Sequence, residues 1–196
     1  MTVRCFVAVR LAENLKKPAA EIMDTLRRTG ADVKWVEPHN LHFTLKFLEE
    51  IEWSRLDSAA SAIDRALNGV TRFTVSLGGV GAFPGGVRPR VVWIGVSSGA
   101  ADLSSLAAKL DREFEKEGFP TERRPFSPHL TLGRVRSSSG AAALSAAIIA
   151  LKHLTMGSMR VSAVHLMKST LTPNGPIYRE IRSWDLPERS DSGVYL

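Results

Sequence analysis

Cysteine is nearly absent from this chain, because Cys5 is the only one among 196 residues. A single cysteine can form neither an internal disulfide nor a cage of cysteine ligands around zinc. The sequence therefore predicts a protein of a reducing compartment, with the cytoplasm as its expected location. Cys5 lies in an apolar, strand-like segment and is expected to be a small core residue.

Long apolar runs are also missing. The longest, 141–151, is interrupted by Ser145, whereas a membrane-spanning helix needs about 20 consecutive apolar residues. The apolar run 5–9 ends at Arg10 and is shorter than the apolar region of about 7–15 residues in a secretory signal. We therefore expect neither a membrane partner nor a secretory leader.

Charge is plentiful but unclustered, since no block of five or more like charges occurs and a basic tail is excluded. Lys and Arg number 26 against 20 Asp and Glu, which leaves a formal net charge of +6. This excess favours an anionic partner such as a phosphate ester or nucleic acid, although mild basicity for solubility explains it equally well. The chain is 44% hydrophobic and 23% charged, which is typical of a globular protein with a real core.

Helical and strand-like segments follow one another in groups rather than in a steady alternation. This order favours an α+β fold with antiparallel strands over a doubly wound parallel sheet. The glycine-rich stretch 78–86 lacks the lysine-serine ending of a phosphate-binding loop and is expected to be a flexible connection. We predict one domain over 1–186 and a mobile tail over 187–196. Helices are expected at 16–29, 56–67, 102–117 and 140–151, and strands at 2–9, 33–36, 41–48, 73–77, 90–96, 129–135, 159–171 and 177–184.

Two segments of the chain match each other. Residues 40–45 read NLHFTL and residues 127–132 read SPHLTL, and each follows a proline-containing turn and opens a predicted strand. The two histidines, His42 and His129, lie 87 residues apart, which is close to half the chain. Because residues i and i+2 of a strand share a face, each histidine should point the same way as Thr44 or Thr131. If the halves are related by a pseudo-two-fold axis, the two pairs face each other across a cleft.

Such a pair of motifs suits phosphodiester chemistry without a metal. The unperturbed pKa of histidine, about 6.5, lets one imidazole accept a proton while the other donates one. The threonine hydroxyls can donate hydrogen bonds to the non-bridging phosphate oxygens. One His-x-Thr alone is typical of any half-buried strand, but two matching copies favour catalysis.

These motifs make the chain resemble the two-histidine phosphoesterase superfamily, and within it the RNA 2′,3′-cyclic phosphodiesterases, also called 2′-5′ RNA ligase-like proteins. The resemblance covers roughly 3–184. Besides the two motifs, the matching segments are 4–9 (RCFVAV), 34–38 (KWVEP), 81–84 (GAFP), 89–93 (PRVVW), 126–128 (FSP) and 169–178 (STLTPNGPIY).

The resemblance implies two pseudo-symmetric lobes, each an antiparallel sheet with outer helices, around a positively charged central cleft. It implies hydrolysis of a terminal 2′,3′-cyclic phosphate to a 2′-phosphate with no metal and no cofactor. By motif position, His42 is the proton donor and His129 the proton acceptor, which the residues alone leave open. Joining RNA ends through a 2′-5′ linkage would be a secondary activity. Glutamate at position 49, where relatives commonly have glycine, is a departure from the family pattern.

Four further residues are candidates for substrate binding. Lys46 has the strand parity of His42 and is expected to meet phosphate, unless it is simply solvated. Arg134 has the opposite parity from His129 unless a bulge at Gly133 corrects it. Phe126 and Tyr178 could stack on a nucleobase, although core packing is the alternative for Phe126.

Two other functions remain open. A nucleotide- or RNA-binding module without turnover would keep the fold, but the intact motifs disfavour it. A phosphodiesterase acting on small cyclic nucleotides or on ADP-ribose cyclic phosphate would use the same four residues. The expected partner is an RNA or oligonucleotide end with a 2′,3′-cyclic phosphate. A monomer is expected because one chain supplies both histidines.

Overall fold

Two antiparallel sheets and four α-helices make up the computed structural model, which describes residues 1–189 except 87 and 174. This confirms the predicted α+β class. The helices are α1 (Glu13–Arg27), α2 (Leu56–Ala66), α3 (Ala100–Lys116) and α4 (Ala141–Ala150), with short 3-10 turns at Pro38–Asn40 and Trp53–Arg55. The strands are β1 (Thr2–Arg10), β2 (Val33–Trp35), β3 (His42–Glu52), β4 (Phe73–Phe83), β5 (Val91–Ser98), β6 (His129–Val135), β7 (Thr155–Val161), β8 (Ala163–Thr172) and β9 (Gly175–Asp185).

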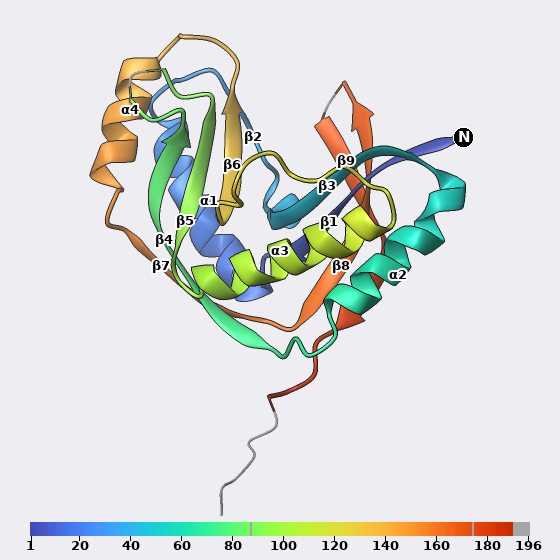
Figure 1. Ribbon diagram of the computed structural model, residues 1–196. Coiled ribbons are helices and arrows are strands. Elements are labelled where there is room, and N and C mark those ends of the chain that lie inside the picture. Colours follow the sequence, from blue (N-terminus) through green and yellow to red (C-terminus); the bar gives the residue numbers. More distant parts are fainter. Residues whose placement is uncertain (87, 174, 190–196) are drawn as a thin grey trace, which may run out of the picture.

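Each sheet with its helices forms one lobe (Figure 1). The first lobe has the strand order β3-β1-β8-β9 and is covered by α2 and α3. The second lobe has the order β2-β6-β5-β4-β7 and is covered by α1 and α4. Strands β3 and β6, which carry the two motifs, contact each other where the lobes meet. Both motifs therefore lie at the boundary between the lobes.

The chain passes between the lobes more than once. Strand β4 follows α2 of the first lobe but pairs with β5 and β7 in the second sheet. The predicted single strand 159–171 is wrong, because the chain breaks at Ser162: β7 pairs with β4, whereas β8 pairs with β1 in the other sheet. Each lobe is thus built from both halves of the sequence, which ties the two motif strands into one folded unit.

The glycine-rich stretch is a second difference from the prediction. Strand β4 continues through it to Phe83, and its glycines leave room for close neighbours. A Cβ atom on Gly81 would lie 2.3 Å from the ring of Trp93, and one on Gly78 would lie 2.6 Å from the carbonyl oxygen of Leu154. Gly78 and Gly81 therefore serve close packing rather than a flexible loop, whereas Gly85 and Gly86 lie in the connection beyond the strand.

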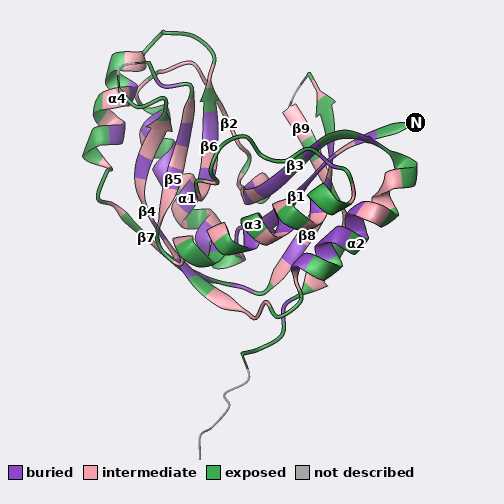
Figure 2. Cartoon of the chain, in the orientation of Figure 1, coloured by how far each residue is buried: buried purple, intermediate pink, exposed green. Residues whose placement is uncertain are grey.

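The core lies between each sheet and its helices, as the buried inner faces in Figure 2 show. Helix α3 is representative, because Leu103, Leu106, Leu110 and Phe114 recur at helical spacing and all are buried. No helix in the described ranges is long and apolar enough to cross a membrane.

The predicted mobile tail begins with residues that are held in place. The backbone N–H of Arg72 donates to the carbonyl oxygen of Pro187, and its guanidinium contacts Glu188 at 2.7 Å. The rest of the tail, 190–196, lies outside the described residues.

Candidate active site

The two motif strands share one irregularity at the same position. Thr44 pairs with Ala8, but the next register pair joins Lys46 to Val7, so Leu45 is an extra residue in β3. In β6, Thr131 pairs with Trp93 and Gly133 with Val92, so Leu132 is extra in the same way. A β-bulge of this kind puts two successive side chains on one face. The strand parity beyond each threonine is therefore reversed.

This reversal overturns the expectation for Lys46. Its side chain is only 1% exposed and points into the first lobe, where its ammonium donates to Asp111 Oδ1 at 2.6 Å and to the carbonyl oxygen of Pro120 at 2.8 Å. The Asp111 carboxylate also accepts the backbone N–H of Glu122 at 3.1 Å. Lys46 thus anchors the segment between α3 and β6 onto β3, and it does not line the face that carries His42.

The same reversal favours Arg134. The bulge at Leu132 and Gly133 supplies the condition on which the prediction depended, and it brings Arg134 to the face of His129 and Thr131. Gly133 packs closely there, because a Cβ atom on it would lie 2.6 Å from the side chain of Val33 and would force that side chain to shift. The residue equivalent to Arg134 in the first lobe is Phe47, which is 48% exposed. Simple alternation along β3 could not identify Phe47.

Both imidazoles are held by the same local hydrogen bond. His42 Nδ1 lies 2.6 Å from the carbonyl oxygen of Asn40, and His129 Nδ1 lies 2.7 Å from that of Ser127. Because a carbonyl only accepts, Nδ1 carries a proton in each ring and donates it. The Nε2 atom of each histidine is therefore the nitrogen that remains for proton transfer.

Aromatic side chains surround His42. Its ring stacks on Phe6 at 4.8 Å between centroids, and Tyr178 meets it edge-on at 5.3 Å. Burial lowers the pKa of His42, and the hydrogen bond to Asn40 only partly opposes this. Burial also raises the pKa of Tyr178, against the positive charges of Arg134 and Arg4. The structure thus brings the predicted residue Tyr178 next to His42 and within electrostatic range of Arg134 from the other lobe.

His129 has different neighbours. Phe83 meets its ring edge-on at 5.1 Å, and Trp93 lies at 6.4 Å. Phe83 is 37% exposed, and the indole Nε1 of Trp93 is buried without a hydrogen-bond partner in the described structure. The motifs alone do not indicate Phe6, Phe83 and Trp93 as neighbours of the histidines. The signal available was that all three lie in segments shared with the family.

Of the remaining candidates, the two threonines are available to a ligand, whereas Phe126 is part of the packing around the core. Thr44 and Thr131 are half-buried, and neither hydroxyl is engaged by a hydrogen bond within the part of the chain that the structure describes. Phe126 packs against the main core, which is the alternative given for it above. Among the described residues, no group of three or more His, Cys, Asp or Glu side chains could hold a metal ion.

Comparison with known proteins identifies the class to which this fold and site belong. A family model described as the 2′-5′ RNA ligase superfamily matches residues 15–172, a range that contains both motifs. A solved structure, TT0787 of Thermus thermophilus, is similar with a TM-score of 0.76 and 26% identity over 94% of this chain and 98% of that one. This likeness supports the two-lobed fold.

Curated relatives make the assignment more specific. The chain is 43% identical over 186 residues to an RNA 2′,3′-cyclic phosphodiesterase of Methanothermobacter thermautotrophicus, covering 95% of this chain and 100% of the relative. It is 36% identical over 164 residues to one of Aeropyrum pernix, covering 83% and 91%. The chain therefore belongs to the RNA 2′,3′-cyclic phosphodiesterase family of the 2′-5′ RNA ligase superfamily, as its resemblance predicts.

Proposed function

We propose that this chain hydrolyses the terminal 2′,3′-cyclic phosphate of RNA to a 2′-phosphate, by acid–base catalysis at two histidines and without a metal or cofactor. The observation that carries the proposal is the repeated geometry of the motifs. Each supplies a histidine with Nε2 available, held by the carbonyl oxygen two residues earlier, and a threonine on the same face. Relatives that are 43% and 36% identical bear the name of this activity.

In the proposed step, water attacks phosphorus while the bond to the 3′ oxygen breaks. Nε2 of His129 takes the proton from water as the new P–O bond forms, and Nε2 of His42 gives its proton to the departing 3′ oxygen. The hydroxyls of Thr44 and Thr131 donate to the non-bridging oxygens, where negative charge accumulates. His42 ends neutral and His129 protonated, so exchange with solvent restores both for the next turnover.

The low pKa of His42 fits a donor that is charged only with substrate present. In the free protein, burial disfavours the imidazolium. A bound phosphate brings a negative charge next to the ring, which favours the protonated form that the step requires. Arg134, on the face of His129, would add positive charge on the opposite side of the same phosphate.

Single-turnover hydrolysis tests the proposal. An oligonucleotide that ends in a 2′,3′-cyclic phosphate should give a product with a 2′-phosphate, at the same rate with and without a chelator. A 3′-phosphate product would show that the 2′ oxygen, not the 3′ oxygen, is the leaving group. Loss of activity in chelator would show that the reaction needs a metal. A bound but unchanged substrate after long incubation would instead favour the binding module.

Three finer statements belong to the same proposal. The same ring opening with a 5′ hydroxyl in place of water would join RNA ends through a 2′-5′ linkage. A panel of small cyclic nucleotides and ADP-ribose cyclic phosphate distinguishes an RNA enzyme from one that acts on small substrates. We further propose a monomer, because one chain supplies both histidines, and a cytoplasmic location, because the single cysteine is typical of a reducing compartment.

A further inference from the structure

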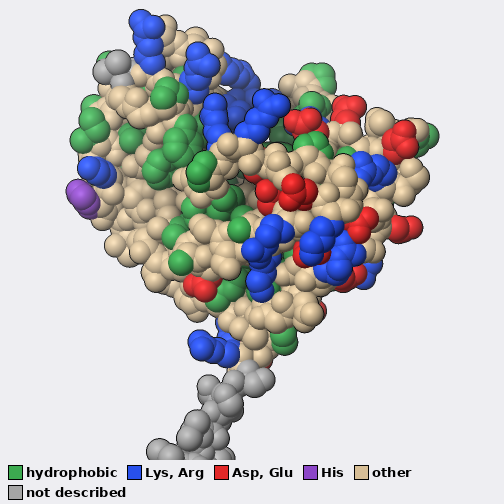
Figure 3. Space-filling model, in the orientation of Figure 1, with side chains coloured by type: hydrophobic (Ala, Val, Ile, Leu, Met, Phe, Trp, Pro, Cys, Tyr) green, Lys and Arg blue, Asp and Glu red, His purple; other side chains and the backbone are tan. Residues whose placement is uncertain are grey.

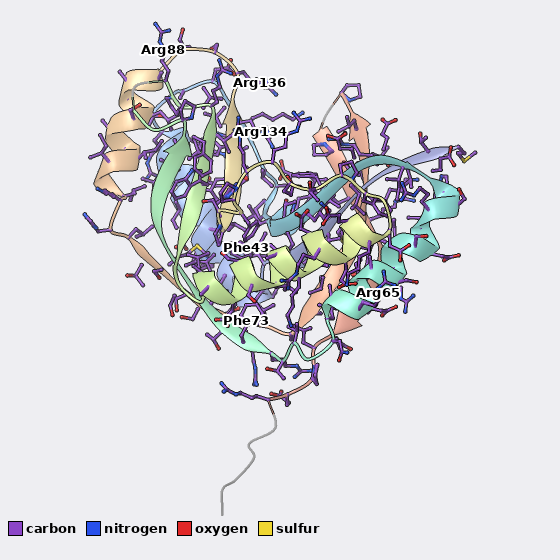
Figure 4. All side chains as sticks on the ribbon, viewed as in Figure 1. Phe43, Arg65, Phe73, Arg88, Arg134 and Arg136 are labelled. Carbon is purple, nitrogen blue, oxygen red and sulfur yellow. The ribbon has the colours of Figure 1, made fainter. Side chains whose placement is uncertain are left out.

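Five cations gather at one end of the second lobe, around the C-terminal end of β6. We call this set the basic rim, and it consists of Lys34, Arg88, Arg90, Arg134 and Arg136. All are exposed except Lys34, which is half-buried. Figure 4 shows Arg88, Arg134 and Arg136 at this end of the lobe, and Figure 3 shows Lys and Arg side chains over the same region.

Strand pairing joins the rim into one surface. Lys34 and Arg134 are direct partners on β2 and β6. The backbone N–H of Arg90 donates to the carbonyl oxygen of Phe83, and its own carbonyl oxygen accepts from Val135. Since the ring of Phe83 contacts His129, the rim begins next to the candidate active site.

Among the described residues, several arginines outside the rim are paired with carboxylates, unlike the rim cations. Arg27, Arg65, Arg72, Arg160 and Arg182 each lie within ion-pair distance of a carboxylate. Within the described residues, none of the five rim cations has a carboxylate partner. Unpaired cations crowded at one end of a sheet repel one another, so a polyanion is the ligand that they favour.

The first lobe has the opposite character at the end of its motif strand. Glu49, Glu50 and Glu52 are all exposed there, with Arg4 as the cross-strand partner of Glu50. Figure 3 shows acidic side chains on this lobe, with Lys and Arg side chains among them. A chain of phosphates that leaves the candidate active site is thus repelled on one side and attracted on the other.

We propose that the single-stranded RNA preceding the cyclic phosphate lies along the basic rim, and that the rim makes the protein prefer oligonucleotides to cyclic mononucleotides. A cyclic mononucleotide has no further phosphates to reach the rim, whereas an oligonucleotide does. Each phosphate contact on a single strand contributes about −0.7 to the slope of log affinity against log salt. This inference rests on the proposed function only for the identity of the RNA end.

The test is the triple variant R88A/R90A/R136A, which leaves Arg134 in place. Its KM for a cyclic-phosphate oligonucleotide should rise at least tenfold, and its salt slope should become shallower by about 2. Its kcat/KM for 2′,3′-cyclic AMP should be unchanged. A matched control, K17A/R112A/K152A, removes three exposed cations elsewhere and should behave like the parent protein.

Two outcomes would contradict the proposal that the basic rim binds RNA. One is equal loss of activity on both substrates, and the other is an equal change in salt slope for the control variant. Fluorescence anisotropy with an oligonucleotide ending in a 3′-phosphate measures the same slope without turnover. If the parent hydrolyses neither substrate, the proposed function fails, while this binding measurement still decides whether the rim holds RNA.

Discussion

The two halves of the candidate site share their backbone and differ in what surrounds it. Both have a bulge after the threonine and an imidazole held through Nδ1. His42, however, is enclosed by Phe6 and Tyr178, whereas His129 borders the exposed ring of Phe83. Beyond the bulge, the residue that returns to the histidine's face is Phe47 in the first lobe and Arg134 in the second.

Because of this difference, the histidines of the two similar motifs lie in different electrostatic environments. In the first lobe, burial lowers the pKa of His42 and so favours its neutral ring, whereas a bound anion would favour the charged form. In the second lobe, unpaired cations lie near His129 and attract that anion. In the proposed mechanism, one half would respond to the phosphate that the other half recruits. The neighbouring strands, rather than the motifs, would then distinguish the proton donor from the acceptor.

Removing either imidazole tests whether both halves are needed. Both His42→Ala and His129→Ala should lower kcat by about 10²-fold or more, because each removes a proton-transfer group. Quenched single-turnover assays with a cyclic-phosphate oligonucleotide measure the loss. His153→Ala, which removes an exposed histidine after α4, is the control and should keep the parent rate. If one of the two motif variants keeps its activity, only the other histidine takes part in proton transfer.

The variant Lys46→Met tests whether Lys46, which follows the bulge in β3, binds substrate or stabilises the fold. Breaking a buried ion pair costs about 3–5 kcal/mol, and partial exposure of Asp111 places the expected loss near the lower end. Urea unfolding measures this loss. Lys109→Met, the same change at a less buried position on α3, should have little effect. If the variant is as stable as the parent protein but binds RNA more weakly, Lys46 contacts the substrate instead.

The titration of His42 tests the electrostatic side of the comparison. By NMR, its pKa should lie below the usual 6.5 in the free protein and rise when a phosphate ligand binds. Since the unfolded chain then binds the proton more tightly, this group makes the protein less stable as pH falls below about 6.5. His42→Gln should remove that part of the pH dependence. An unshifted pKa would show that the aromatic enclosure does not desolvate the ring.

Much of this comparison was available from the sequence, but its asymmetry was not. The repeated His-x-Thr-Leu predicts two strand faces with a histidine and a threonine, because parity over two residues is a local property. Beyond the threonine, parity depends on register with β1 and β5, which are distant in sequence. That register explains why the predicted phosphate contact of Lys46 is wrong. It also explains why the prediction for Arg134 depended on a bulge at Gly133.

Other differences have the same origin. The change of sheet at Ser162 is invisible in an unbroken alternation of apolar residues, because nothing local says which sheet a strand joins. Strand β4 runs through its glycines because Trp93 from the adjacent strand occupies the space above Gly81. The aromatic rings around each histidine likewise come from neighbouring strands. Tertiary contacts, rather than propensity, decide each of these positions.

Glu49 offers the smallest test, and one that the sequence itself suggested. It is the only described non-glycine residue with positive φ, at 57°, and it follows a second bulge at Leu48 in β3. A left-handed conformation costs an ordinary residue about 1–2 kcal/mol, whereas glycine adopts it freely. After the entropy that glycine loses on folding, Glu49→Gly should stabilise the protein by about 0.5–1 kcal/mol. Glu50→Gly, one residue further along the strand, should destabilise it by a similar amount. Equal responses of the two variants in thermal unfolding would mean that the bulge imposes no strain, and that glutamate at position 49 costs the first lobe nothing.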